Sequence, residues 1–412
     1  MNIKRLAIIA AATAALGAAA QTSSSPYSMF GYGILNDNAT SAQRQMGGVG
    51  YATNSPHNIN VMNPASYASI DSLTFLFDMG VDFTTIWRKE NSATDKTYGG
   101  GLEYVTLQAP LSKRFGLSLG LLPFSSVGYS FGSSIDNGLQ TRSGSGGFNQ
   151  AYVGLSAKTF KGLSVGFNAS YLFGTNLAET YAISSDAETS LFQRTIQVRD
   201  FRIQVGAQYT ARFDNKSSAT IGVVYSPKKT LLGHTWSTKE QVLADGSSGD
   251  IDTLAYISMR NNYELPHTFG VGLSYNYDNR LTAAVDFTYQ KWADVKYTAI
   301  ELSDVARFSD RWKIAAGMEY RPAIRGSWPK RVTYRAGVFY NKDYINIGGS
   351  QVKDYGAAIG FGFPTPGGRS MVNLGLEYRH RTAGSNYLRE NFLNVTLGFK
   401  INEMWFWKSK IR

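Results

Sequence analysis

Charged side chains that could bind a ligand recur on one side of stretches in which apolar and polar residues alternate. Near residue 315, Lys313 and Glu319 share a face opposite Ile314 and Met318, because alternate residues of a strand point the same way. Such charges could hold the carboxylate headgroup of an amphipathic ligand. We favour ordinary pairing among themselves, or with another part of the chain, in a watery interior. The candidate residues on polar faces are Arg202, Arg212, Asp286, Lys313, Glu319, Arg335, Glu377 and Arg379.

Residue types that serve catalysis or metal binding are present, but not in suitable patterns. His57, His234, His267 and His380 are scattered without metal-ligand spacing, and the chain has no cysteine. The glycine-rich stretch 47–50 lacks the preceding strand and the following Lys-Ser/Thr of a phosphate-binding loop. We therefore predict that the protein is not an enzyme and uses no cofactor or metal. A barrel hydrolase with its triad spread over several strands is the enzymatic alternative.

The elements that must position these residues are strands. From Asp71 onward, stretches of about ten residues alternate apolar and polar side chains and are broken by turn residues. There are about fourteen of them, roughly twice as many as in a soluble sandwich. Short connections, such as the Asp278-Asn279 turn, alternate with long ones near 133–147, 183–195 and 231–256. The sequence thus predicts an all-β fold: a transmembrane antiparallel β-barrel over residues 71–402, with lipid outside and water inside.

The N-terminus has the composition of a secretory signal peptide. Lys4 and Arg5 precede the apolar run 6–16, and 18–20 offer an Ala-x-Ala cleavage site, so we predict that residues 1–20 are removed. A retained anchor is the alternative, but the run is shorter than the roughly 18 apolar residues of a membrane helix. Export and a barrel together predict the bacterial outer membrane. Many residues behind the net charge of +11 lie in short turns, so we expect contact with lipid headgroups and not with nucleic acid.

Two segments lie outside the alternating pattern. Residues 21–70 are rich in Gly, Asn, Ser and Ala, and a barrel of this size would be open to water unless something filled it. We therefore predict that 21–70 form a plug, or hatch, in the lumen; a disordered periplasmic tail is the alternative. Residues 403–412 combine Trp with Lys and Arg, which suits either a periplasmic interface anchor or a site that docks a partner protein.

The stretches 45–52 and 60–66 resemble the N-terminal hatch of the FadL/TodX family of outer-membrane transport proteins, with its glycine-rich turn followed by Asn-Pro-Ala. Segments 120–131, 162–174 and 264–275 resemble Bacteroidota-type members, as does the tail. The resemblance covers the mature chain and implies a barrel of about fourteen strands. It also implies that the hatch is built around Gly47, Gly48, Gly50, Asn60, Asn63, Pro64 and Ala65.

Pro123 interrupts the third alternating stretch. Proline cannot donate to a sheet ladder, so within a sheet it marks an edge or a bulge. In FadL proteins a kink in the third strand opens a side window to the lipid, so the resemblance implies a lateral gate here. An ordinary proline at the barrel rim is an equal alternative. The gate would be lined by Leu121, Leu122, Pro123, Phe124 and Ser125.

Two functions follow from these features. The first is an outer-membrane channel for passive uptake of hydrophobic or amphipathic small molecules, such as long-chain fatty acids, with lateral release through the wall. The second is a non-transporting barrel that serves as a subunit or shuttle of an outer-membrane protein secretion or assembly complex, as in PorV-like relatives. The partners are therefore outer-membrane lipids with a hydrophobic ligand, or an outer-membrane or periplasmic protein. An apolar tunnel reaching Pro123 would favour the first function, and a lumen sealed by salt bridges the second.

Overall fold

The computed structural model describes residues 25–135, 138–184, 189–242, 247–298, 306–324, 326–366 and 369–404. The predicted signal peptide and residues 405–412 of the predicted tail lie outside this part of the chain. Among the described residues, no helix combines the length and apolar character needed to cross a membrane.

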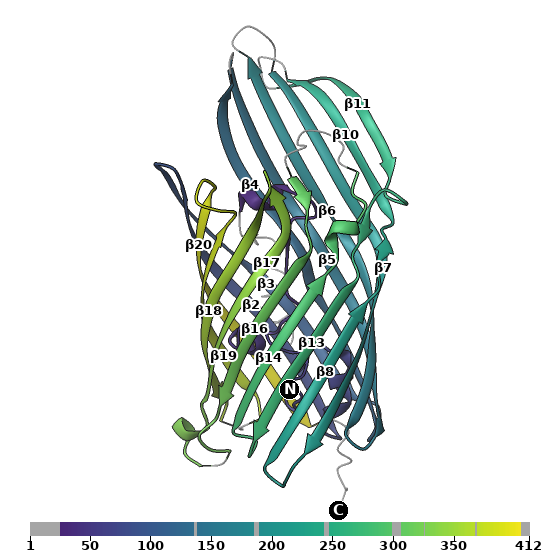
Figure 1. Cartoon of the computed structure of the whole chain (residues 1–412), viewed down its shortest axis with the longest axis vertical. Helices are drawn as coiled ribbons and strands as arrows, with labels where there is room; N and C mark the ends of the chain where they lie inside the picture. The colour runs from purple at the N-terminus through teal and green to yellow at the C-terminus, as the bar shows by residue number, and fades with distance from the viewer. Residues whose placement is uncertain are drawn as a thin grey trace, which may run out of the picture.

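Fourteen antiparallel strands close into a barrel, as predicted (Figure 1). Closure is made by β2, which pairs with β3 on one side and with β20 on the other. In ring order the strands are β2 (Thr74–Glu90), β3 (Ala93–Pro110), β4 (Phe115–Ile135), β5 (Gly138–Phe160), β6 (Leu163–Ser184), β7 (Thr189–Arg212), β8 (Ser217–Ser226), β13 (Thr268–Tyr277), β14 (Leu281–Gln290), β16 (Arg311–Tyr320), β17 (Thr333–Ile347), β18 (Ser350–Pro364), β19 (Met371–Thr382) and β20 (Arg389–Met404).

Apolar side chains cover the outside of the barrel. Along β13, Val271 and Leu273 are 47% and 58% exposed, whereas Ser274, on the opposite face of the strand, is buried. Only a membrane makes such a continuous exposed apolar surface favourable, so the fold places the chain in an outer membrane. The turn after β13 is tight because Asp278 and Asn279 adopt positive φ angles of 54° and 52°, a conformation that Asn and Asp tolerate.

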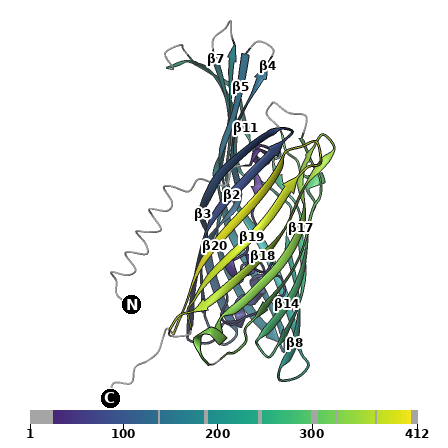
Figure 2. The ribbon, with the colours of Figure 1, turned by 90° about the vertical axis from the view of Figure 1, so that its left-hand side faces the viewer.

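The long connections expected at 133–147, 183–195 and 231–256 are mostly strand, so that prediction was wrong. Strands β4 to β7 continue far beyond the barrel, and β10 (Gly233–Val242) and β11 (Ser248–Ser258) extend the sheet from the edge of β7. Residues 127–135, 138–147, 174–184, 189–199, 233–242 and 248–258 form this raised sheet, which stands above the rest of the molecule in Figures 1 and 2. With no apolar face turned to lipid, its segments 138–147 and 189–195 lack the alternation that reveals the barrel strands.

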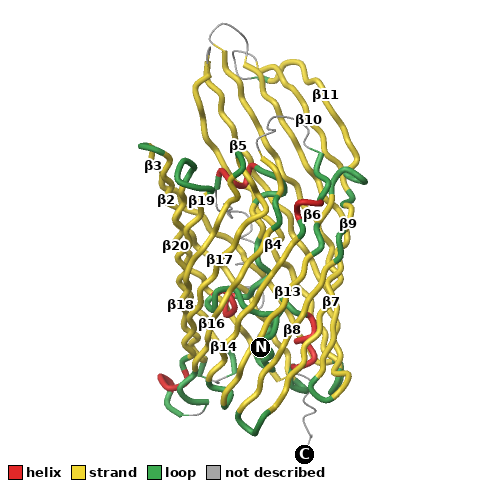
Figure 3. The backbone as a smooth tube through the Cα atoms, viewed as in Figure 1, coloured by secondary structure: helices red, strands yellow, loops and turns green. Residues whose placement is uncertain are grey.

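Residues 25–70 form an N-terminal segment with little regular structure, and its residues are mostly buried. Figure 3 shows helix only as short pieces against the continuous strands. In this segment they are η1 (Pro26–Met29), α2 (Ser41–Arg44) and η2 (Pro64–Ser69), with the short strand β1 (Ile34–Leu35). The remaining elements lie in connections: β9 (Lys229–Thr230), β12 (Glu264–Leu265), η3 (Trp292–Asp294), β15 (Ala306–Phe308) and η4 (Trp328–Arg331).

The barrel wall accommodates the N-terminal segment through glycine. A Cβ atom at Gly337 of β17 would overlap the backbone of Met46, and one at Gly222 of β8 would overlap the backbone of Tyr51. Because these two strands are not neighbours in the ring, the segment contacts the barrel wall at several separate points. Glycine is required where the two backbones approach this closely.

Candidate functional site

Asp37 and Arg44 are the two charged residues between residues 21 and 70, and each forms an ion pair with the barrel. Asp37 accepts from the Lys313 ammonium at 2.5 Å and lies 3.5 Å from the Arg311 guanidinium; both cations come from β16. Burial alone would raise the pKa of Asp37, but Lys313 and Arg311 lower it well below its usual range. The carboxylate is therefore ionised at all physiological pH values. The isolated charges of Asp37 and Arg44 in an otherwise uncharged segment were the signal in the sequence. Neither residue was predicted as a site residue.

Arg44 makes the second ionic contact between the N-terminal segment and the wall. Its guanidinium lies 3.0 Å from the carboxylate of Glu103 on β3, and both side chains are largely buried. A buried charge that loses its partner is strongly destabilising. Together, Asp37 and Arg44 connect the segment to β16 and β3.

Arg335 connects the segment to the wall through neutral and charged partners. Its guanidinium donates to Glu319 at 2.6 Å, to Gln45 of the segment at 2.9 Å and to Asn373 at 2.8 Å. The side chain of Arg335 is 1% exposed. Arg335 and Glu319, both predicted lumen residues, thus pair with each other, and Arg335 also binds Gln45 of the segment.

Asp286 holds the glycine-rich part of the segment. Its carboxylate accepts from the backbone N–H groups of Gly50 at 2.6 Å and Tyr51 at 2.8 Å. Just before these residues, Gly47 and Gly48 adopt positive φ angles of 75° and 86°, a conformation that favours glycine. Sequence reasoning identified these residues, although it did not predict that they would contact one another.

The Asn-Pro-Ala part of the segment is held by its own side chains. Asn60 donates to the Gly50 carbonyl at 2.6 Å. Asn63 caps η2 by accepting from the Ala65 N–H at 3.1 Å, and it donates to the Tyr51 carbonyl at 2.7 Å. Pro64 occupies the first turn of η2, where its missing N–H costs nothing. The two predicted hatch motifs therefore form one hydrogen-bonded unit.

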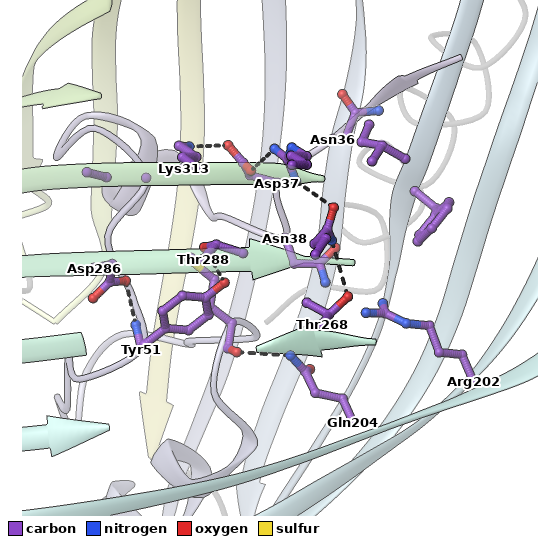
Figure 4. A pocket seen from close by; sticks show the side chains of 17 residues that line it. Asn36, Asp37, Asn38, Tyr51, Arg202, Gln204, Thr268, Asp286, Thr288 and Lys313 are labelled. Carbon is purple, nitrogen blue, oxygen red and sulfur yellow. Dashed lines mark hydrogen bonds and ion pairs between the residues drawn. The ribbon is translucent and has the colours of Figure 1, made fainter. Parts of the chain in front are cut away.

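A cavity of about 70 Å³ lies between the segment and the wall (Figure 4). Arg202 points toward it, 3.2 Å from the Ser226 hydroxyl and 5.6 Å from the centre of the Phe124 ring. Among the described residues, no carboxylate lies within ion-pair distance of Arg202. Asp37, Asp286 and Lys313 also line the cavity. Its wall combines these charged groups with apolar side chains such as Met62 and Phe124. The cavity is far smaller than the 300–1,000 Å³ of a typical ligand pocket.

The other predicted lumen residues have different surroundings. Glu377 and Arg379 pair at 2.6 Å, and Arg379 also lies 3.6 Å from Asp354. Arg212 is exposed at the end of β7 and does not join the interior group. No group of three or more potential metal ligands occurs within the described ranges.

The wall changes at Pro123. Pairing of β3 with β4 ends at Val105 and Leu121, whereas β4 and β5 remain paired beyond it, with a register shift between Pro123 and Ser125. Pro123 therefore lies at a bulge inside a long strand, not at the strand's end. Leu121 is exposed, and Leu122 and Ser125 are buried.

The N-terminal segment covers β4 beside this bulge. Strand β1 pairs antiparallel with β4, placing Leu35 opposite Ser125, and the N–H of Asn36 donates to the Phe124 carbonyl at 3.0 Å. The predicted gate residues thus lie together, and the segment pairs with β4 where the pairing with β3 has ended.

The fold is shared with solved outer-membrane channels. The CymD monoaromatic hydrocarbon channel is 15% identical, with a TM-score of 0.62 over 89% of this chain and 98% of that one. The toluene transporter TbuX of Ralstonia pickettii is 14% identical, with a TM-score of 0.59 over 88% and 98%. A FadL homologue from Pseudomonas aeruginosa is 13% identical, with a TM-score of 0.58 over 90% and 99%.

These neighbours are transport channels for hydrophobic compounds, not enzymes. They confirm the predicted FadL-like barrel, and at such low identity the likeness concerns the fold alone. No curated protein sequence matches this chain. Family membership comes instead from a sequence model that matches residues 1–412, the whole chain: the protein belongs to the BamG family.

Proposed function

We propose that this protein is a non-transporting barrel subunit of an outer-membrane protein secretion or assembly complex, in which residues 25–70 form a fixed plug. The observation that carries the proposal is the set of buried contacts between the N-terminal segment and the barrel wall. One cavity between this segment and the wall measures about 70 Å³. That space suits a few water molecules and not a fatty acid or an aromatic hydrocarbon.

The contacts of the segment support a fixed plug. Asp37, Arg44 and Gln45 bind charged partners on three parts of the wall, β16, β3 and β17. A path for a ligand would require several of these buried contacts to break together. Breaking a buried ion pair leaves an uncompensated charge and costs several kcal/mol.

The charged groups that line the cavity also oppose passage of a hydrophobic ligand. The charged groups of Lys313, Arg311 and Arg202 line the cavity, and an apolar ligand there would displace water from them without replacing their hydrogen bonds. A hydrophobic channel needs the opposite, a largely apolar path with few polar groups.

Native purification tests the proposal directly. The full-length protein is purified in mild detergent and examined by native mass spectrometry, and the same sample is reconstituted for uptake of a radiolabelled long-chain fatty acid. We expect a stoichiometric protein partner and no uptake above protein-free liposomes. Bound fatty acid without a protein partner, together with uptake, would contradict the proposal.

The second candidate function is passive uptake of hydrophobic small molecules with lateral release. Its specific support is the end of β3–β4 pairing beside Pro123, in a fold shared with hydrocarbon channels. Under this function, Pro123→Val would restore a regular strand and slow uptake in liposomes, whereas Pro366→Val, distant in the chain, is the control. Equal uptake by the wild type and Pro123→Val would remove the gate.

A further inference from the structure

One side of β4 above the bulge carries backbone groups without a partner strand. In the barrel, β3 pairs with β4 as far as Leu121, and β1 then pairs at Ser125 and Ser126. Above them, Gly128 completes this side: its carbonyl accepts from the Ser25 N–H at 2.6 Å, and its N–H donates to the Ser28 hydroxyl at 3.0 Å. Within the described ranges, β4 pairs only with β5 beyond this point.

The next residues on the free side follow from strand geometry. Backbone groups alternate between the two neighbours of an antiparallel strand. Gly128 faces away from β5, and no register shift between β4 and β5 occurs above Ser125. The N–H and C=O groups of Ser130, Gly132 and Ser134 therefore lie on the same free side. In the described part of the chain, no hydrogen bond joins them to another segment.

This edge lacks the features with which proteins protect exposed edges. Residues 125–135 include no charged residue and no proline, and the strand is regular above Ser125. Natural edge strands are usually blocked by charges, prolines or bulges, because an unprotected edge pairs with other chains. Ser130, Gly132 and Ser134 are also small and exposed, so no side chain obstructs an approaching strand.

The other free edge of the raised sheet is protected. Strand β11 pairs only with β10 among the described strands. It carries Asp250 and Asp252, and two register shifts interrupt its pairing with β10. The same sheet thus has one blocked edge and one open edge, which indicates that the open edge is used.

We infer that the β4 edge at Ser130–Ser134 binds an extended, uncharged segment of a partner outer-membrane protein by adding it as a further strand. Strand β1 already pairs with this edge two positions below Gly128, so the edge accepts an added strand. Recognition comes from main-chain hydrogen bonds, and the small uncharged residues Ser130, Gly132 and Ser134 offer no ion-pair partner to a charged segment. The inference rests on the proposed function, because it names the surface through which the subunit meets its partner.

Proline substitution tests the edge selectively. Ser130→Pro with Ser134→Pro removes two N–H donors from the free side and leaves the ladder with β5 intact. The matched control, Ser130→Ala with Ser134→Ala, keeps both donors. We expect the proline variant to co-purify about tenfold less of the partner found with the wild type, and the alanine variant to retain it. Heat-modifiable migration on gels verifies that both variants form barrels.

Site-specific cross-linking adds a positive readout, because the chain has no cysteine. A benzophenone maleimide on Ser130→Cys should cross-link the same partner, whereas one on Thr253→Cys of β11 should not. Retention of the partner by the proline variant, equal cross-linking from both sites, or a cross-linked homodimer would overturn the edge assignment and leave the proposed function standing. Absence of any stoichiometric partner of the wild type would overturn both.

Discussion

The barrel and the raised sheet share strands β4 to β7, yet they treat the edges of the sheet differently. In the barrel, β2 pairs with both β3 and β20, so the ring closes. In the raised sheet, β4 and β11 each have one side without a partner strand in the described part of the chain. The bilayer core cannot solvate unpaired backbone groups, whereas water above it can.

The two regions also differ in what lies against their inner faces. Inside the barrel, glycine positions such as Gly337 meet the backbone of the N-terminal segment, and buried ion pairs fix it there. The raised sheet carries Arg142 and Lys239, for which the described residues provide no ion pair. The comparison teaches that the sheet closes on itself where lipid surrounds it and keeps free edges where water surrounds it.

Proline substitution should give the largest difference in stability between the barrel and the raised sheet. Val271→Pro places proline in β13, which pairs with strands on both sides, and we expect a loss of at least about 3 kcal/mol or no assembled barrel. Ser130→Pro, on the free edge, should change stability by less than about 0.5 kcal/mol. The heat-modifiability midpoint measures both. Similar losses for the two variants would remove the distinction between closed and open edges.

Removal of the Arg335 side chain tests whether the plug is fixed by its buried contacts. Arg335→Met leaves Glu319, Gln45 and Asn373 without their donor, so we expect a loss of about 3 kcal/mol. We also expect a higher ion conductance in planar bilayers, because Gln45 belongs to the segment. Arg280→Met is the control, since its ion pair with Asp278 is exposed and contributes little. An unchanged conductance would show that Arg335 does not hold the plug.

A side chain at Gly337 tests close contact without changing charge. Gly337→Ala places a Cβ against the backbone of Met46, and such overpacking costs roughly 1–3 kcal/mol. Gly132→Ala in the raised sheet is the matched control, because its Cβ meets only ordinary contacts. The midpoint of thermal unfolding, followed by gel migration, should be lower than that of the wild type for Gly337→Ala but not for Gly132→Ala. Equal midpoints would mean that the segment yields easily at this point.

The smallest effect concerns pH. The folded-state pKa of Asp37 is depressed by Lys313 and Arg311, so its contribution is present above the unfolded pKa of about 4 and is lost as pH falls toward the folded value. The stability difference between the wild type and Asp37→Asn should therefore stay constant from about pH 5 to 8 and shrink below about pH 4. Unfolding midpoints of the two proteins across pH measure it. A difference that changes near neutral pH would show that Asp37 is not paired in the folded protein.

Much of the barrel was readable from the sequence because alternation records which face meets lipid. Leu273 and Ser274 illustrate the rule, one exposed and the other buried. The raised sheet was mistaken for long loops, since water on both faces imposes no such pattern on residues 133–147. The hatch glycines and asparagines were recognised by resemblance, but Asp37 and Arg44 were missed because a lone charge does not identify its partner.

The sequence by itself determined the fold class and the approximate number of strands, because a bilayer enforces period-two patterning along each strand. Only the tertiary structure decided that Lys313 meets Asp37 and that Pro123 lies at a bulge beside which β1 pairs with β4. It also decided that the free edge of β4 lacks the charges and register shifts found at the free edge of β11. These features depend on strand register and on chain segments far apart in sequence, which no local pattern encodes.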